Sequence, residues 1–245
     1  MLDKKLLLKK THDFSAVKNP KLTVIFLHGI ASDSGSTYTK ALEYLEGTTS
    51  LKEVRFVTFD LLGSGESYSG DELNYDFKDQ LEALKNSIKK LKISTPIVLV
   101  GHSMGGLIAT RYADTYKKSI KKLILVSTPT YTVDNLDSPM FKAEMEAFKK
   151  LVAAKNPKYV NDKAFHNEVK NIVLNKSNYN KLLNLKTPAV LIYSESDRTI
   201  MPQNIRKIIK LNPKYLSGVT TIGTHRVARD KYNKIKDVLE EMLNA

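Results

Sequence analysis

The 245-residue sequence contains no cysteine. This absence excludes disulfide bridges, a cysteine nucleophile and a thiolate metal site. No two histidines have the spacing of zinc ligands with a carboxylate nearby, so we expect no bound metal. Eighteen apolar residues never occur in a row, and the three consecutive leucines near the N-terminus are too few for the core of a signal peptide. We therefore expect a soluble, cytoplasmic protein without an integral membrane segment.

Arginine is also scarce. The formal net charge is +13, but the 39 basic residues comprise 33 lysines and 6 arginines, scattered along the chain. Nucleic-acid sites favour clustered arginines with aromatic residues between them, and no such cluster occurs. We interpret the lysines as a solvated surface and expect no nucleic-acid partner. A weak attraction to anionic lipid surfaces or acidic substrates is the alternative.

Apolar, strand-like runs alternate with amphipathic helical stretches along the whole chain. Between residues 77 and 91, apolar side chains recur at spacings of four, three, four and three, which predicts one buried helical face. The alternation predicts an α/β fold with a mostly parallel central sheet of six to eight strands flanked by helices. We expect a short first strand over residues 5–9. The length suits a single catalytic domain with a sizeable core.

About sixty residues separate the expected strand at 123–127 from the one starting at Ala189, far more than a usual connection. We expect a small helical cap over residues 130–187, inserted after the sixth strand. Residues 1–129 and 188–245 would then form the core. Two apolar stripes predict cap helices. They are Phe141, Met145, Phe148 and Val152, and Phe165, Val169 and Ile172.

Ser103 lies at the centre of the pattern Gly101-His102-Ser103-Met104-Gly105, between an apolar run and a helix-like stretch. Such a sharp strand-to-helix turn presents a nucleophilic hydroxyl outward. The turn leaves no room for a side chain two residues before or after the serine, which explains Gly101 and Gly105. We expect His102 to point away from Ser103.

A serine nucleophile needs a base to take its proton and an acid to orient that base. Asp197 follows the apolar run 189–193, and His225 follows the run 219–222. The order Ser, Asp, His is typical of one class of hydrolases. Three other carboxylates remain open as alternatives for the acid. They are Glu195, Asp134 and Asp137.

Four blocks together resemble the α/β-hydrolase family over nearly the whole chain. Two are the serine turn and the Asp197/His225 pair. The third, His28-Gly29-Ile30, resembles the family's oxyanion loop, and the fourth, residues 60–67, is similar to its D-x-x-G-x-G-x-S loop. The pattern most resembles small carboxylesterases and monoacylglycerol-lipase-like members. It departs from the family at Ser194, where glycine is usual.

The resemblance implies a fold and a mechanism. Ser103 would attack an ester carbonyl, His225 would move the proton, and Asp197 would orient His225. The backbone N–H groups of Ile30 and Met104 would stabilise the oxyanion. The histidine of the His28-Gly29 pair would hold the oxyanion loop by hydrogen bonding, and the cap would shape the acyl pocket.

The sequence therefore predicts a serine hydrolase that cleaves small-molecule acyl esters through an acyl-serine intermediate, without a cofactor. Thioesterase and serine peptidase or amidase activity use the same three residues and remain alternatives. A non-catalytic ligand-binding protein on a hydrolase scaffold is the alternative from another class. The acyl chain, the alcohol and the oligomeric state do not follow from these patterns.

Overall fold

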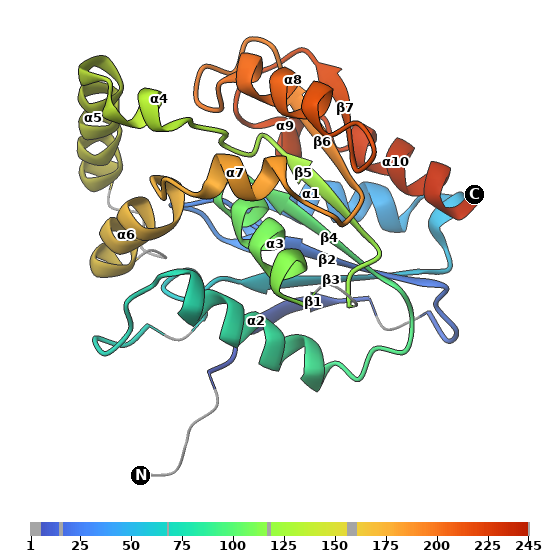
Figure 1. The fold of residues 1–245 in the computed structure, drawn as a ribbon. Coiled ribbons are helices and arrows are strands. Elements are labelled where there is room, and N and C mark those ends of the chain that lie inside the picture. Colours follow the sequence, from blue (N-terminus) through green and yellow to red (C-terminus); the bar gives the residue numbers. More distant parts are fainter. Residues whose placement is uncertain (1–5, 15–16, 68, 117–118, 156–160, 245) are drawn as a thin grey trace.

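A computed structural model describes residues 6–14, 17–67, 69–116, 119–155 and 161–244. These residues form a seven-stranded sheet with the order β1-β3-β2-β4-β5-β6-β7 (Figure 1). The first strand is antiparallel to its neighbour, and all other pairs are parallel. The expected α/β fold with a mostly parallel sheet is confirmed. The strands are β1 (Lys9–Asp13), β2 (Leu22–Leu27), β3 (Val54–Asp60), β4 (Ile97–His102), β5 (Lys122–Val126), β6 (Ala189–Ser194) and β7 (Leu216–Thr221).

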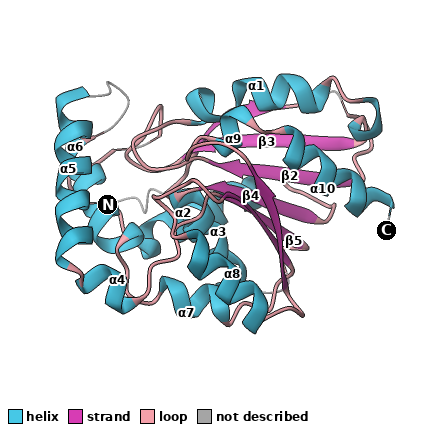
Figure 2. Ribbon diagram, turned by 90° about the horizontal axis from the view of Figure 1, so that it is seen from above, coloured by secondary structure: helices cyan, strands magenta, loops and turns pink. Residues whose placement is uncertain are grey.

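Helices cover both faces of the sheet (Figure 2). Strand β2 explains this arrangement, because Val24 and Phe26 belong to one core and Ile25 and Leu27 to the other. The first core is completed by α1 (Ser34–Glu46), α9 (Val227–Asp230) and α10 (Asn233–Asn244). The second is completed by α2 (Phe77–Lys90), α3 (Met104–Thr115) and α8 (Pro202–Leu211). A short 3-10 turn, η1 (Thr49–Leu51), precedes β3.

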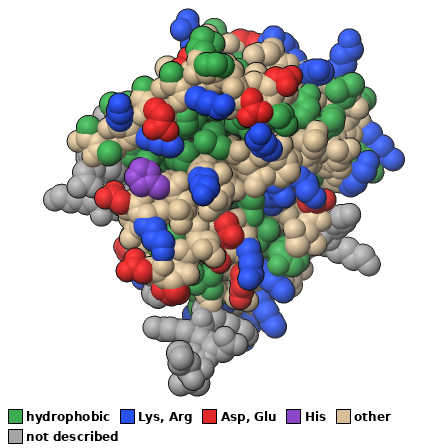
Figure 3. All heavy atoms as spheres, turned by 60° about the vertical axis from the view of Figure 1, so that its left-hand side comes forward, with side chains coloured by type: hydrophobic (Ala, Val, Ile, Leu, Met, Phe, Trp, Pro, Cys, Tyr) green, Lys and Arg blue, Asp and Glu red, His purple; other side chains and the backbone are tan. Residues whose placement is uncertain are grey.

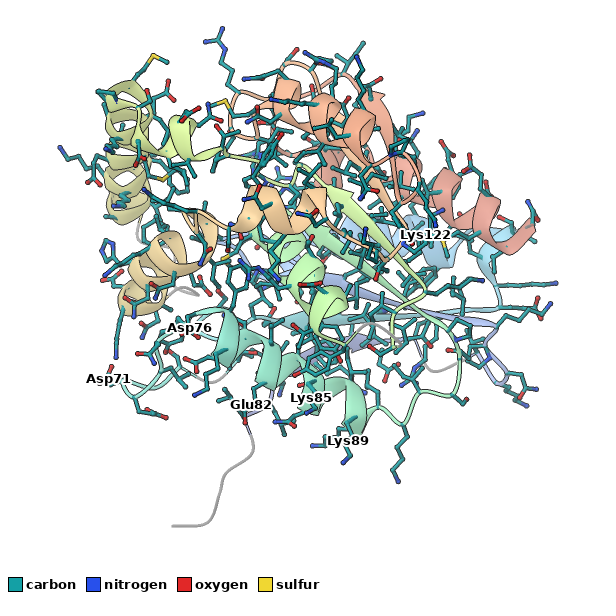
Figure 4. The ribbon with its side chains drawn as sticks, viewed as in Figure 1. Asp71, Asp76, Glu82, Lys85, Lys89 and Lys122 are labelled. Carbon is teal, nitrogen blue, oxygen red and sulfur yellow. The ribbon has the colours of Figure 1, made fainter. Side chains whose placement is uncertain are left out.

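Helix α2 has the buried face that its sequence predicts. Asp76 caps its N-terminus by accepting a hydrogen bond from the Asp79 N–H. On the opposite face, Glu82 and Lys89 extend outward into solvent, and the exposed Lys85 has its Nζ 5.3 Å from the centre of the Tyr116 ring (Figure 4). These lysines are part of a solvated surface, as interpreted from the sequence.

Residues 130–187, called here the helical insertion, lie between β5 and β6, at the left of Figure 1. Their apolar stripes are helical, with Phe141 and Phe165 buried. Part of the expected cap, residues 156–160, lies outside the described residues. The helices are α4 (Val133–Asp137), α5 (Pro139–Lys155), α6 (Asp162–Glu168), the π-helical turn η2 (Val169–Val173) and α7 (Asn178–Leu183).

Two sequence predictions about strands need correction. Within the described ranges a single strand precedes β2, so the insertion follows the fifth strand and not the sixth. That first strand covers Lys9–Asp13 and not residues 5–9, because it pairs with β3 from Lys9 opposite Asp60 to Asp13 opposite Val57. Residues 1–5 themselves are outside the described ranges. The lysine-rich first strand lacks the apolar alternation that would fix its register from sequence.

Candidate active site

Ser103 occupies a tight turn between β4 and α3. Its backbone has φ 51° and ψ −118°, a strained conformation for a residue other than glycine. A Cβ atom on Gly101 would lie 2.5 Å from the Gly105 carbonyl oxygen, and one on Gly105 would lie 2.2 Å from the Leu27 carbonyl oxygen. The two glycines are therefore required for the close approach that holds this turn, for the reason that the sequence indicated.

The three side chains that were singled out from the sequence meet at this turn. His225 Nε2 lies 2.9 Å from Ser103 Oγ, and His225 Nδ1 lies 2.8 Å from Asp197 Oδ2. The residues follow β4, β6 and β7, whose carboxyl ends lie at one edge of the sheet. A carboxylate beside Nδ1 accepts its proton in a hydrogen bond, which leaves Nε2 free to accept from the serine hydroxyl.

Asp197 is buried and held in place. Its Oδ1 accepts a hydrogen bond from the Thr199 N–H at 3.0 Å. Burial acts to raise the pKa of Asp197, but the hydrogen bond and charge of His225, together with Thr199, outweigh it, so the pKa lies below its ordinary value. The carboxylate is therefore ionised at neutral pH and can stabilise a protonated His225.

The other candidate acids lie elsewhere. Glu195 is exposed and pairs with Arg206. Asp137 pairs with Lys176 at 3.1 Å, and Asp134 is exposed on α4. Of the four carboxylates considered from the sequence, the fold brings Asp197 to His225.

Ser194, at the family's usual glycine position, joins the loop that holds Asp197 to the loop that holds His225. Its hydroxyl donates to the Gly223 carbonyl oxygen at 2.6 Å and accepts from the Ser196 N–H at 3.2 Å. The departure from the family pattern thus adds a contact between the loops that hold Asp197 and His225.

His28 anchors the loop that follows β2. The fully buried ring accepts a hydrogen bond from the Leu61 N–H at Nε2 and donates from Nδ1 to the Gly29 carbonyl oxygen, at 2.9 and 2.8 Å. Burial lowers the pKa of His28, which matches this neutral pattern of one donor and one acceptor. Nearby, the N–H groups of Ile30 and Met104 donate to no acceptor among the described residues.

The sequence did not indicate the contact that His102 makes. Its Nε2 lies 2.9 Å from the backbone carbonyl oxygen of His225, a residue 123 positions away, and donates to it. Burial, followed by the neighbouring charge of His225, lowers the pKa of His102 to about 3, so the ring is neutral. Although the residue as a whole is half-buried, its Nδ1 is inaccessible and has no partner among the described residues. His102 therefore supports the loop that holds His225 and makes no hydrogen bond to Ser103.

A cavity of about 570 Å³ opens at Ser103 and His225. The helical insertion supplies much of its apolar wall, through Phe141, Met145, Phe148, Leu151 and Val173. Its size and lining suit a small organic ligand. Another cavity, of about 550 Å³, lies between β1 and α2, but its lining contains no histidine beside a nucleophile. We therefore place the candidate site at Ser103.

The described ranges of the chain contain no group of three His, Asp or Glu side chains placed to hold a metal ion. None of their helices combines the length and the apolar character that crossing a membrane requires.

Comparison with known proteins gives matches over most of the chain. Residues 23–170 match the family model of the alpha/beta hydrolase fold. Probable lysophospholipase BODYGUARD 5 of Arabidopsis thaliana is 30% identical over 139 residues, 57% of this chain and 31% of that protein. The chain spans less than a third of the length of the plant relatives it matches. The AB hydrolase superfamily protein YisY of Bacillus subtilis is 26% identical over 91% of both chains.

Solved structures share the fold at low sequence identity. The esterase EaEST from Exiguobacterium antarcticum has a TM-score of 0.76 and 16% identity, with 98% of this chain and 99% of that chain covered. A monoacylglycerol lipase from Paleococcus ferrophilus has a TM-score of 0.66 and 20% identity, with 97% and 98% covered. At such identities these similarities concern the fold alone.

Proposed function

Because the chain belongs to the alpha/beta-hydrolase family and carries the hydrogen-bonded series Ser103, His225 and Asp197, we propose that it is a serine hydrolase that cleaves carboxylic esters. Membership of this family, together with the name of the relative called a probable lysophospholipase, supports a hydrolase. The observation that carries the serine mechanism is the 2.9 Å separation of His225 Nε2 from Ser103 Oγ.

In the proposed mechanism, Ser103 Oγ attacks the ester carbonyl carbon while His225 Nε2 takes its proton. The charge that develops on the carbonyl oxygen is stabilised by the N–H groups of Ile30 and Met104. The tetrahedral intermediate collapses, His225 returns the proton to the leaving alcohol, and an acyl-serine remains. Water then attacks this ester with His225 as the base, which releases the acid and regenerates the enzyme.

Because the wall of the cavity is apolar, we propose that the substrate contains an acyl chain. Phe141, Met145 and Phe148 line the cavity from α5, so we propose that the helical insertion acts as a cap over Ser103 and binds that chain. The name of the plant relative, a probable lysophospholipase, agrees with an amphiphilic ester. Thioester or amide cleavage by the same three residues is the second candidate.

The proposal is tested with p-nitrophenyl esters from acetate to palmitate, alongside a monoacylglycerol, a lysophospholipid and an acyl thioester. We expect turnover of esters, and a loss of about 10³-fold or more in the Ser103→Ala variant. Circular dichroism checks that the variant is folded. Turnover of the esters by Ser103→Ala at the wild-type rate would contradict the proposal, and faster thioester cleavage would favour the second candidate.

A further inference from the structure

Two arginines directly follow the proposed catalytic pair. Arg198 is next to Asp197 and Arg226 is next to His225, and both line the cavity at Ser103 while remaining exposed. Neither guanidinium makes a hydrogen bond or an ion pair with any other described residue. Both are therefore free to bind a ligand.

The other four arginines of the chain all have partners. Arg55 pairs with Asp13 at 2.8 Å, Arg206 with Glu195, and Arg229 with Asp230 at 3.7 Å. Arg111 donates to Asn175 and Ser177. Most of the positive charge of the chain is carried by lysine. The two arginines without a partner among the described residues, Arg198 and Arg226, both lie at the mouth of the cavity.

A guanidinium binds a phosphate or carboxylate through two parallel hydrogen bonds, which lysine does not do. The face that carries the helical insertion has hydrophobic side chains in the upper half of Figure 3, with lysines, arginines and acidic side chains around them. One acidic side chain, Glu144 of α5, lines the same cavity. The formal charges of Arg198, Arg226 and Glu144 sum to +1, which favours an anion at the mouth of the cavity.

The position of the arginines indicates which part of an ester carries the anion. His225 has to reach the leaving oxygen to return a proton to it, so the residue beside it borders the alcohol side of the ester. The apolar wall formed by α5 is left for the acyl chain.

We propose that the preferred substrate is an acyl ester of an alcohol that carries a phosphate group, and that Arg198 and Arg226 bind this phosphate. Two guanidinium groups match the charge of a phosphate monoester, about −1.5 to −2 at neutral pH. This inference rests on the proposed ester hydrolysis and adds the chemical class of the alcohol.

The test compares two soluble esters that differ in one group, 1-hexanoylglycerol and 1-hexanoylglycerol 3-phosphate. The readout is the ratio of their kcat/KM values, phosphate ester over neutral ester. We expect Arg198→Gln and Arg226→Gln each to lower this ratio about fivefold, because kcat/KM for the phosphate ester should fall more than kcat/KM for the neutral ester. Arg229→Gln is the matched control, because this exposed arginine lies three residues beyond Arg226 and outside the cavity lining.

Glu144→Gln provides a test of opposite sign. Removing this carboxylate from the cavity lining should raise the ratio, because it repels the phosphate. Added salt should lower the wild-type ratio toward the ratio of a variant that carries both Arg198→Gln and Arg226→Gln, since exposed charges are screened.

The outcomes separate this inference from the proposed function. If neither ester is cleaved and Ser103 does not react with a fluorophosphonate, the hydrolase proposal fails. If both esters are cleaved and the ratio is the same in wild type, Arg198→Gln and Arg226→Gln, the phosphate inference is wrong. A fall in kcat/KM for both esters equally would also overturn it, because the arginines would then act on the loops and not on the anion.

Discussion

Ser103 is held in its strained backbone conformation by close backbone contacts on both sides of the turn. A positive φ at a non-glycine residue is unfavourable by about 1–3 kcal/mol and persists only where the surroundings fix it. Here the Ser103 N–H donates to the Val126 carbonyl oxygen at 2.9 Å, and the Gly106 N–H donates to the Ser103 carbonyl oxygen at 3.0 Å. This geometry brings the hydroxyl to His225.

The role proposed for Asp197 predicts the effect of its closest isostere. Asp197→Asn keeps the shape but replaces the carboxylate acceptor at His225 Nδ1, which favours the wrong tautomer of the imidazole. We expect kcat to fall about 10³- to 10⁴-fold with a small change in KM. Steady-state kinetics on a p-nitrophenyl ester measure this. A loss below tenfold would mean that Asp197 does not orient the base, and Glu195→Gln, which alters an exposed pair, should have little effect.

Residue order singled out Ser103 and His225 and made Asp197 one of four candidate acids, because each follows an apolar run and parallel strands end at one edge of the sheet. The supporting contacts were not predictable in this way. His102 reaches the backbone of a residue 123 positions away, and Ser194 reaches a carbonyl 29 positions away. Such contacts depend on how two loops pack, which no periodicity in the sequence records.

At the scale of the elements, one buried acid joins the helical insertion to the core. Glu168, at the junction of α6 and η2, is fully buried, and its Oε1 accepts a hydrogen bond from Gln80 of α2 at 2.9 Å. Gln80 also bonds both backbone groups of Leu62, at 3.1 and 3.2 Å. Burial raises the pKa of Glu168 well above its ordinary value, more than the Gln80 hydrogen bond lowers it.

Glu168→Gln should therefore stabilise the protein at alkaline pH. Above the ordinary glutamate pKa the unfolded chain ionises while burial still favours the protonated form of Glu168, so the wild type loses stability as pH rises. The amide has no proton to lose and can still accept from Gln80. We expect the free energy of unfolding in urea to rise by about 1–3 kcal/mol at pH 8 and to change little at pH 5. Exposed Glu82→Gln is the control, and a destabilised Glu168→Gln protein at pH 8 would contradict this account.

The helices of the insertion were predictable from their apolar stripes, since the spacing of Phe141, Met145 and Phe148 fits one face of α5. The π-helical turn after Glu168 was not predictable, because its residues do not follow the spacing of three and four that marks an α-helix. The same is true of β1, whose position depends on pairing with β3 and not on its own alternation.

For the whole molecule, three buried groups predict a maximum of stability at an intermediate pH. Burial lowers the pKa of His28 and His102, so below about pH 6.5 the unfolded chain binds protons that the native rings do not, and stability falls. Glu168 has the opposite sign and lowers stability as pH rises. The two histidines therefore lower stability toward acid pH and Glu168 lowers it toward alkaline pH, so we expect stability to decline on both sides of an intermediate pH.

Urea unfolding at a series of pH values from about 4.5 to 8.5 measures this curve. In the Glu168→Gln variant we expect the alkaline decline to be smaller while the acidic decline remains. A wild-type curve that rises steadily toward acid pH would show that the two histidines do not resist protonation.

The central claim is that Ser103 is an activated nucleophile, and reaction with a fluorophosphonate tests it most directly. Intact mass and peptide mapping should show one adduct on the wild-type protein, at Ser103, and none on Ser103→Ala. The His225→Ala variant should react at least about 100-fold more slowly, because the base is gone. A wild-type protein that stays unlabelled, or one labelled at another serine, would contradict the account.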